Sequence, residues 1–446
     1  MIFDKIYQLL GLNKNSGMAR YLVKGSSAGF LIIAFNIGLT FINSIVVANL
    51  AGGYELGRYE YIMTWINLFC IFALFGYHTL AVREIPKLKA NNDFEGIKHF
   101  WQQSFWWVLL AALSTAILGW YTLVFFGLVD ASDYNLLKIG MLMLPFWVLA
   151  LLISGVLRGS KHIISSQIPT QLIRPIIFVV AATCLYFCFQ QFTATSIFTA
   201  QLIALVITLA VAIFYLRKDE GHLLAKPTEK TYESNWSKAA LLLFFQGLVI
   251  ALNTKFDILL LNSYCTKEEL AYYAIAVKVA ALMGIMLMTV NLVIGPEISR
   301  LYNQNNIVKL EMLVSRSIKL IFVLTIPIAL FLVVFGPFVL SLFGKEFGVG
   351  YPVLVIFIFV ALVNVGAGSV GNILNMTGHE KEVFYGIIVS LVFNVILNII
   401  LIPPFGIIGA AISTGTAIII WNIILWWVVK QKVGINASIF NFKKFS

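Results

Sequence analysis

The chain carries little charge for its length: 11% of its 446 residues are Asp, Glu, Lys or Arg, whereas 60% are hydrophobic. Soluble globular domains carry about 25% charged residues, so this composition excludes a soluble protein. Acidic residues are the scarcer sign, with 20 against 31 basic residues, and the net charge is +11. The basic residues are scattered among short connections between apolar runs. That distribution argues against a nucleic-acid-binding protein and fits contact with anionic lipid headgroups.

Cysteine is also rare, and the motifs of several chemistries are missing. The four cysteines show no Cys/His spacing typical of a zinc or redox site. There is no phosphate-binding glycine loop of the GxxxxGK type and no metal cluster, so ATP hydrolysis by this chain is not expected. The connections are too short to hold an outer glycosyltransferase or polymerase domain. We therefore expect a protein that is not an enzyme and has no cofactor, with H⁺ or Na⁺ as candidate coupling ions.

What the sequence does contain is a series of long apolar stretches. A helix that crosses a bilayer needs about 20 predominantly apolar residues. The pattern predicts an all-α integral membrane protein with about twelve transmembrane helices. These spans are expected near residues 25–50, 59–82, 103–128, 136–157, 169–190, 195–216, 239–263, 271–295, 318–343, 351–376, 383–402 and 406–429.

The distribution of Lys and Arg predicts the orientation of the chain. Of the 31 basic residues, 25 are counted at the two ends and in alternate connections, and this count includes Arg174, near the start of the fifth span. Only four fall in the other connections: Arg58, Lys138, Lys267 and Lys345. Because cytoplasmic loops carry the excess of Lys and Arg, both termini are predicted to be cytoplasmic.

The two halves of the chain look alike. The longest connection, residues 217–238, separates six spans from six, which predicts an N-lobe at 1–230 and a C-lobe at 231–446. The segment LGRY at 56–59 opens the second span, and LAYY at 270–273 opens the eighth span 214 residues later. An even number of spans separates the copies, so they share one orientation. This predicts two pseudo-symmetric six-helix lobes with a cavity between them.

Several segments, taken in order, resemble one family. In the second half they are AYYAIAVK at 271–278 after Asp257, PEIS at 296–299, MTGHEK at 376–381 and LIPPFGIIGAA at 401–411. In the first half, GGYELGRY at 52–59 and REIP at 83–86 fit the same pattern. Together they resemble the polysaccharide-exporter branch of the multidrug/oligosaccharidyl-lipid/polysaccharide flippase superfamily, and most closely a Wzx-type O-antigen flippase. Ala271 departs from the family's usual glycine, which is a conservative change.

The resemblance implies a function, a location and partners. It implies a flippase that moves polyprenyl-pyrophosphate-linked oligosaccharide to the outer face of a bacterial inner membrane, for O-antigen, capsule or exopolysaccharide synthesis. Alternating access driven by an ion gradient is the implied mechanism. The implied partners are the lipid-linked glycan, membrane lipids and the polysaccharide polymerase and chain-length machinery, with no nucleic acid.

Three other functions remain open at this point. An ion-coupled multidrug exporter would favour acidic residues in its cavity, and two intramembrane lysines against one aspartate weigh against it. A membrane polymerase or ligase of lipid-linked sugars would need a larger outer loop. A sugar transporter of the major facilitator type would carry a glycine–aspartate–arginine cluster, which is absent between Arg83 and Lys98.

Three charged residues lie inside the seventh and eighth predicted spans, and a charge costs roughly 2.5–3.5 kcal/mol at the helix centre. They are Lys255 and Asp257 on the seventh span and Lys278 on the eighth. Asn253 and Asp257 share one face, with Lys255 nearly opposite. One interpretation is a cationic patch that meets the diphosphate of the cargo. The alternative is an Asp257–Lys278 ion pair, with Lys255 extended to the interface. Asp257 is also a candidate proton- or sodium-responsive group.

The first span has a polar stripe of its own. Asn36, Thr40 and Asn43 lie on nearly one face of the predicted helix. This stripe could line a cavity wall and bind sugar hydroxyls, or it could make polar contacts between helices. Asn36 and Asn43 are therefore candidate binding residues beside Asn253, Lys255, Asp257 and Lys278.

Overall fold

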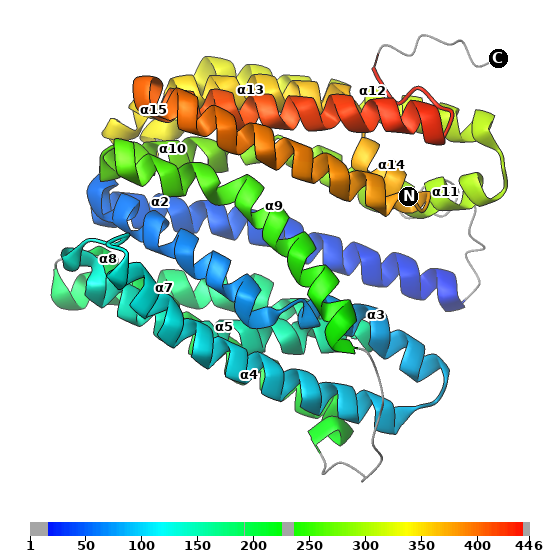
Figure 1. Ribbon diagram of the computed structural model, residues 1–446, viewed down its shortest axis with the longest axis horizontal. Helices are drawn as coiled ribbons and strands as arrows, with labels where there is room; N and C mark the ends of the chain where they lie inside the picture. The colour runs from blue at the N-terminus through cyan, green and yellow to red at the C-terminus, as the bar shows by residue number, and fades with distance from the viewer. Residues whose placement is uncertain (1–16, 191, 225–235, 440–446) are drawn as a thin grey trace. The chain divides into compact units, whose positions relative to one another are not determined.

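The computed structural model describes residues 17–190, 192–224 and 236–439, and every regular element assigned there is a helix. Long helices dominate both halves of the chain (Figure 1). The first half contains α2 (Gly17–Leu74), α3 (Tyr77–Ala90), α4 (Phe94–Phe125), η1 (Ala131–Asp133), α5 (Tyr134–Gly159), α6 (Ile163–Gln167), η2 (Ile168–Ile173), α7 (Arg174–Phe189), α8 (Ala194–Glu220) and η3 (Gly221–Leu224). The rest contains α9 (Trp236–Tyr264), α10 (Lys267–Ala281), α11 (Gly284–Asn303), α12 (Ile307–Ser341), η4 (Lys345–Gly350), α13 (Tyr351–Gly366), α14 (Val370–Met376) and α15 (Glu380–Lys432).

The described residues contain 9 helical stretches that are long and apolar enough to cross a membrane. A tenth is a pair, α10 and the start of α11, bent by 43°. Two of the stretches, Phe35–Ala90 and Glu380–Lys432, hold 56 and 53 residues, or about 80 Å of helix each, more than twice the bilayer core. Their backbones leave helical geometry at Gly52 and Gly406, so each holds two spans. The prediction of about twelve transmembrane helices is thus confirmed.

The chain divides into two compact units, Met1–Leu248 and Val249–Ser446, with the boundary inside α9. The predicted lobe boundary at residues 230 and 231 stays a prediction.

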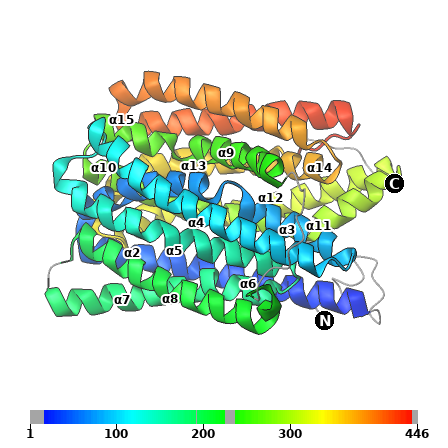
Figure 2. The same ribbon diagram turned by 60° about the horizontal axis from the view of Figure 1, so that its bottom comes forward.

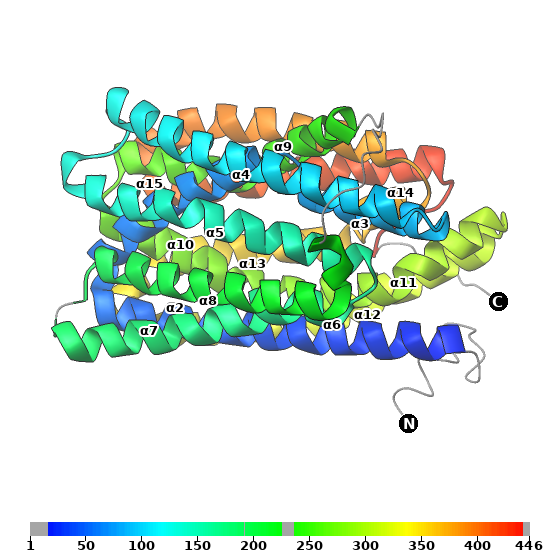
Figure 3. The ribbon, with the colours of Figure 1, turned by 90° about the horizontal axis from the view of Figure 1, so that it is seen from below.

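In the first unit, α5 is the central helix. It packs against α2, α3, α4 and α8, and it lies between α4 and α8 in Figures 2 and 3. Two glycines of α5 let the backbone of α3 approach closely. A Cβ on Gly155 would lie 2.4 Å from the carbonyl oxygen of His78, and one on Gly159 would lie 2.6 Å from that of Ala81. Small residues at helix contacts are the usual basis of such packing in membranes.

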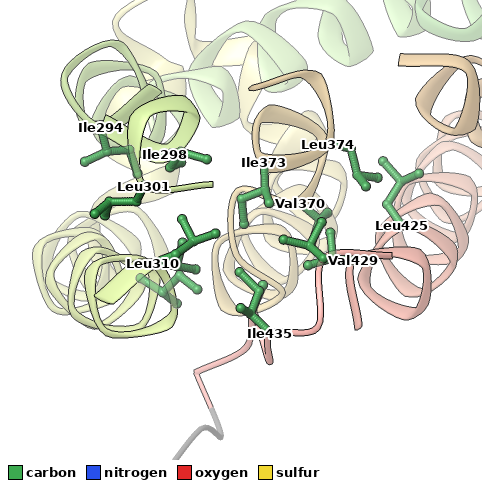
Figure 4. Close-up of a cluster of buried hydrophobic side chains, with 14 of the residues drawn as sticks. Ile294, Ile298, Leu301, Leu310, Val370, Ile373, Leu374, Leu425, Val429 and Ile435 are labelled. Carbon is green, nitrogen blue, oxygen red and sulfur yellow. The ribbon is translucent and has the colours of Figure 1, made fainter. Parts of the chain in front are cut away.

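In the second unit, α13 packs against α10, α12 and α15. A separate buried apolar cluster joins α11, α12, α14, α15 and the chain that follows α15 (Figure 4). Ile435 and Ala437 of this following segment are 1% and 0% exposed. The backbone N–H of Ile439 donates to the carbonyl of Gly366, 2.9 Å away. The segment after α15 therefore covers the break between α13 and α14.

The sequence repeat is also a structural repeat. The turn at Asn91–Asp93 and the turn at Gln304–Asn306 lie 213 residues apart and have the same backbone: Asn92 and Asn305 are both left-handed, with φ of 54° and 53°. The next residue caps the following helix in both cases, because the Asp93 carboxylate accepts from the N–H of Gly96 and the Asn306 side chain accepts from that of Lys309.

The breaks at the other ends of the helices repeat as well. The non-helical residue Gly52 interrupts α2, and Thr266 caps α10 after the break that follows α9. These two residues are 214 apart, which is the offset between LGRY and LAYY in the sequence. Equivalent residues of the two units can therefore be compared by this offset.

Candidate functional site

Asp257 is a buried carboxylate, 4% exposed, on the apolar helix α9. The Tyr273 hydroxyl of α10 donates to Oδ2 of Asp257, and the Thr414 hydroxyl of α15 donates to the same atom over 3.4 Å. The other oxygen, Oδ1, accepts from the backbone N–H of Ile258 at 2.8 Å. A buried carboxylate is costly unless it is hydrogen-bonded, so these donors from three helices are what keep Asp257 inside the unit.

A row of hydrogen bonds continues from Thr414 along α15. Asn394 donates from Nδ2 to the Thr414 hydroxyl at 3.1 Å, and Asn398 donates from Nδ2 to Oδ1 of Asn394 at 2.7 Å. Both asparagines are almost fully buried, and Oδ1 of Asn398 has no hydrogen-bond partner among the described residues. The kink at Gly406 makes this possible, because it folds the two halves of α15 so that Asn394 and Thr414 meet.

Asn253 lies one helical turn before Asp257 and also faces α15. Its Nδ2 donates to the Ser390 hydroxyl at 3.3 Å, and its Oδ1 is buried without a partner. Asn253 and Asp257, which were predicted to share one face, thus both contact α15. The cluster as a whole consists of Asp257, Tyr273, Thr414, Asn394, Asn398 and Asn253, and we call it the Asp257 cluster. Its side-chain oxygens can take a proton at the carboxylate, or a small hard cation, which prefers oxygen ligands.

The two intramembrane lysines lie outside the hydrogen bonds of this cluster. Lys278 follows Tyr273 by five residues, which places it about 140° around α10 from the residue that contacts Asp257. Among the described residues, the hydrogen bonds of Asp257 come from Ile258, Tyr273 and Thr414, and the alternative of an ion pair with Lys278 stays a prediction. Lys255 is half-buried and close enough for its charge to act on Asp257. The binding roles of Lys255 and Lys278 stay predictions.

The polar stripe of the first span makes contacts between helices. Asn36 donates from Nδ2 to the carbonyl of Gln171 at 2.7 Å, and Asn43 donates to the carbonyl of Pro175 at 3.1 Å. Pro175 has no N–H, so the carbonyl of Gln171 lacks its normal helical donor, and Asn36 takes that place. The second interpretation of this stripe thus describes its observed contacts. A role for Asn36 and Asn43 in binding the cargo stays a prediction.

The sequence analysis misplaced Arg174. We counted it with the residues of the connections although it falls inside the predicted span 169–190, and it is the first residue of α7, directly after the π-helical turn η2. Its guanidinium stacks on the ring of Trp147, 4.2 Å from the ring centroid. Trp147 is at the middle of α5, about 20 Å of helix from either end. Arg174 therefore acts at mid-depth in its unit. Pro169 and Pro175 on either side were the available signal that this helix is irregular.

The fold is that of a class of solved multi-pass membrane proteins. A multidrug resistance transporter of the MATE family, in an inward-facing conformation, superposes with a TM-score of 0.74 at 14% identity, over 89% of this chain and 94% of that one. The lipid II flippase MurJ, in an inward closed conformation, gives a TM-score of 0.72 at 19% identity, over 92% of this chain and 87% of that one. These superpositions establish a shared fold, and at identities this low they establish the fold alone.

Sequence comparison establishes the family. The family model for polysaccharide biosynthesis proteins matches residues 22–302, and the MatE model matches residues 243–400. The chain belongs to the family of polysaccharide biosynthesis proteins, within a superfamily of transporters rather than enzymes. The probable low-salt glycan biosynthesis flippase Agl15 of Haloferax volcanii is 27% identical over 224 residues, or 50% of this chain and 46% of that protein. The match thus spans about half the length of this relative.

Proposed function

We propose that this protein is a flippase that moves polyprenyl-pyrophosphate-linked oligosaccharide from the cytoplasmic to the outer face of the membrane, for the synthesis of a surface polysaccharide. The observation that carries this proposal is the match of residues 22–302 to polysaccharide biosynthesis proteins on a transporter fold. The similarity to a protein named as a glycan biosynthesis flippase supports it. The lipid tail would stay in the bilayer while the sugar and diphosphate pass through the protein.

The Asp257 cluster is the proposed coupling site. Intramembrane carboxylates that are buried and hydrogen-bonded are typical of residues that bind a proton or ion during transport. Here Asp257 meets hydroxyl groups from two other helices, and Oδ1 of Asn398 adds a buried oxygen without a donor. Binding of H⁺ or Na⁺ at this cluster would favour one of two conformations, which is what alternating access requires.

The orientation and partners belong to the same proposal. Both termini would be cytoplasmic, because the alternate connections hold most of the Lys and Arg residues. The polysaccharide polymerase and the chain-length machinery would receive the cargo at the outer face.

Deletion of the gene in its own host tests the proposal. We expect loss of the surface polysaccharide together with accumulation of complete lipid-linked units on the cytoplasmic face. Wild-type protein should restore export. Intact polysaccharide in the deletion strain would contradict the flippase function. Single repeat units that accumulate on the outer face would instead indicate a polymerase or ligase.

An ion-coupled multidrug exporter is the second candidate. The MatE match over residues 243–400 is the observation that favours it. In this case the deletion strain would keep its polysaccharide and become more sensitive to cationic drugs. The same strain therefore separates the two functions.

A further inference from the structure

Arg174 is a charged residue at mid-depth of the first unit, where a charge is expensive and usually functional. Its guanidinium has five N–H donors. One face of it is covered by Trp147. Within the described part of the chain, the Arg174 guanidinium donates no hydrogen bond and meets no carboxylate. The side chain thus has an ordered position but unused donors.

The polar atoms that are both buried and unpartnered include the ring nitrogens of Trp65 and Trp120, but no nitrogen of Arg174. The Arg174 side chain as a whole is half-buried. The guanidinium is therefore held on one face by an aromatic ring while its side chain stays partly exposed, which fits a binding group better than a structural ion pair.

The backbone before Arg174 supports this interpretation independently. Residues Ile168–Ile173 form a π-helical turn, a rare element found frequently at functional sites. The hydrogen bond that Pro175 cannot make to Gln171 is replaced by Asn36 of α2. Because a π turn rotates the residues after it, this turn sets the direction in which Arg174 leaves α7. A second helix therefore fixes the position of the arginine.

We propose that Arg174, held by Trp147, binds the diphosphate of the transported lipid within the first unit. This inference rests on the proposed flippase function and assigns the diphosphate to a residue other than Lys255 and Lys278. The planar guanidinium can bind two phosphate oxygens at once, whereas lysine acts as a point charge. Tyr59, which lies within electrostatic range of Arg174, places a hydroxyl near the same site. A single cation against about two negative charges holds the cargo and still permits its release.

Binding to the purified full-length protein in phosphatidylcholine nanodiscs tests this proposal. The probe is farnesyl diphosphate, with farnesyl monophosphate and inorganic pyrophosphate as comparators. We expect Arg174→Gln to weaken farnesyl diphosphate binding by about 10- to 100-fold, the loss typical of a hydrogen bond to a charged group. Arg174→Lys should recover only part of this affinity, because the bidentate contact is lost. Arg217→Gln is the matched control, since Arg217 is an exposed arginine of α8 in the same unit; its affinity should stay within about twofold of wild type.

A second variant guards against misfolding of Arg174→Gln. Trp147→Leu keeps the charge and removes the aromatic face, and it should weaken binding by about threefold or more. Wild-type affinity in both Arg174→Gln and Trp147→Leu would overturn the proposal. Equal binding of phosphatidylglycerol in the nanodisc would also overturn it, in favour of a site for ordinary lipid headgroups. These results are independent of the gene deletion: a strain with intact polysaccharide would remove the flippase function but not an anion site at Arg174.

Discussion

Asn43 and Asp257 occupy the same place in the two halves of the repeat, yet one is an amide and the other a carboxylate. Each precedes a break in its helix by nine residues, at Gly52 and Thr266, and they are 214 residues apart. Their hydrogen bonds run in opposite directions. Asn43 donates to the carbonyl of Pro175, whereas Asp257 accepts from hydroxyl groups. The two residues thus occupy equivalent positions in the repeat, but contacts with the neighbouring helices favour an amide at one and a carboxylate at the other.

The residues around Asn43 and Asp257 also differ in charge between the two units. Tyr59 is the counterpart of Tyr273, but its ring packs against Phe198 at 5.2 Å and it lies near Arg174 instead of an acid. The first unit therefore combines a neutral Asn43 with an arginine that has unused donors. The second combines Asp257 with buried oxygens. The same repeated backbone thus carries a site suited to an anion in the first unit and a site suited to a cation in the second.

Asp257→Asn makes the second unit resemble the first at this position, and it should have the largest effect. The amide keeps the shape of the side chain but cannot take a proton or hold a cation by charge. We expect transport of a fluorescent lipid-linked glycan in proteoliposomes to fall by about 10-fold or more, and its dependence on an imposed H⁺ or Na⁺ gradient to disappear. Gradient-dependent transport at the wild-type rate would show that coupling lies elsewhere.

The reverse change, Asn43→Asp, should destabilise the first unit. It replaces a buried donor by an acceptor that faces the carbonyl of Pro175. The cost should be about 3 kcal/mol, since a buried acceptor is left unsatisfied and carries charge. Thermal unfolding in detergent measures this loss. Asn49→Asp is the control, because it makes the same charge change at an exposed position of α2; an equal loss there would mean that the surroundings of Asn43 are not special.

The equivalent tyrosines should respond differently to loss of the hydroxyl. Tyr273→Phe removes a donor to the buried carboxylate of Asp257 and should cost about 1–3 kcal/mol of stability. Tyr59→Phe keeps the ring contact with Phe198 and, among the described residues, breaks no hydrogen bond; we expect a change of less than about 0.5 kcal/mol. Comparing the unfolding midpoints of the two variants checks this. Equal losses would mean that the Asp257 contact does not stabilise the protein.

The sequence predicts the spans and the repeat on which this comparison rests, but not the hydrogen-bond partners of the compared residues. Apolar run length and the offset between LGRY and LAYY were enough to predict about twelve spans and the repeat, because both depend on local pattern. The stripe of Asn253 and Asp257 could also be predicted, since it follows from helical periodicity.

The remaining features depend on tertiary structure. Thr414 lies 157 residues from Asp257 and reaches it only because α15 kinks at Gly406. Hydropathy also does not reveal the π turn that precedes Arg174. Neighbouring helices also made Lys278 a plausible partner of Asp257, whereas the hydrogen-bond donor observed on α10 is Tyr273.

The smallest expected effect concerns the two helix breaks, at Gly52 in the first unit and after α9 in the second. The first unit has Gly52 at this point, whereas the second has Cys265 followed by a capping box in which Thr266 and Glu269 exchange hydrogen bonds. The pKa of the Cys265 thiol is raised to about 11, most by burial and further by the charge of Glu269 and a hydrogen bond to it. At pH 7.5 only about one thiol in 3,000 is then the reactive thiolate. With the pKa this high, maleimide labelling should rise about tenfold per pH unit up to at least pH 9.

Glu269→Gln sharpens this last test, because glutamine can keep the capping hydrogen bonds while it removes the charge. The pKa of Cys265 should fall, and labelling at pH 7.5 should become several-fold faster in a protein whose other cysteines, Cys70, Cys184 and Cys188, are replaced by Ala. Ala131→Cys in the same background, with Cys265 also replaced, provides an exposed thiol whose labelling should not respond to Glu269→Gln. If labelling of Cys265 stops rising below pH 9, or does not change in Glu269→Gln, the acidic neighbour is not what distinguishes this break from the one at Gly52.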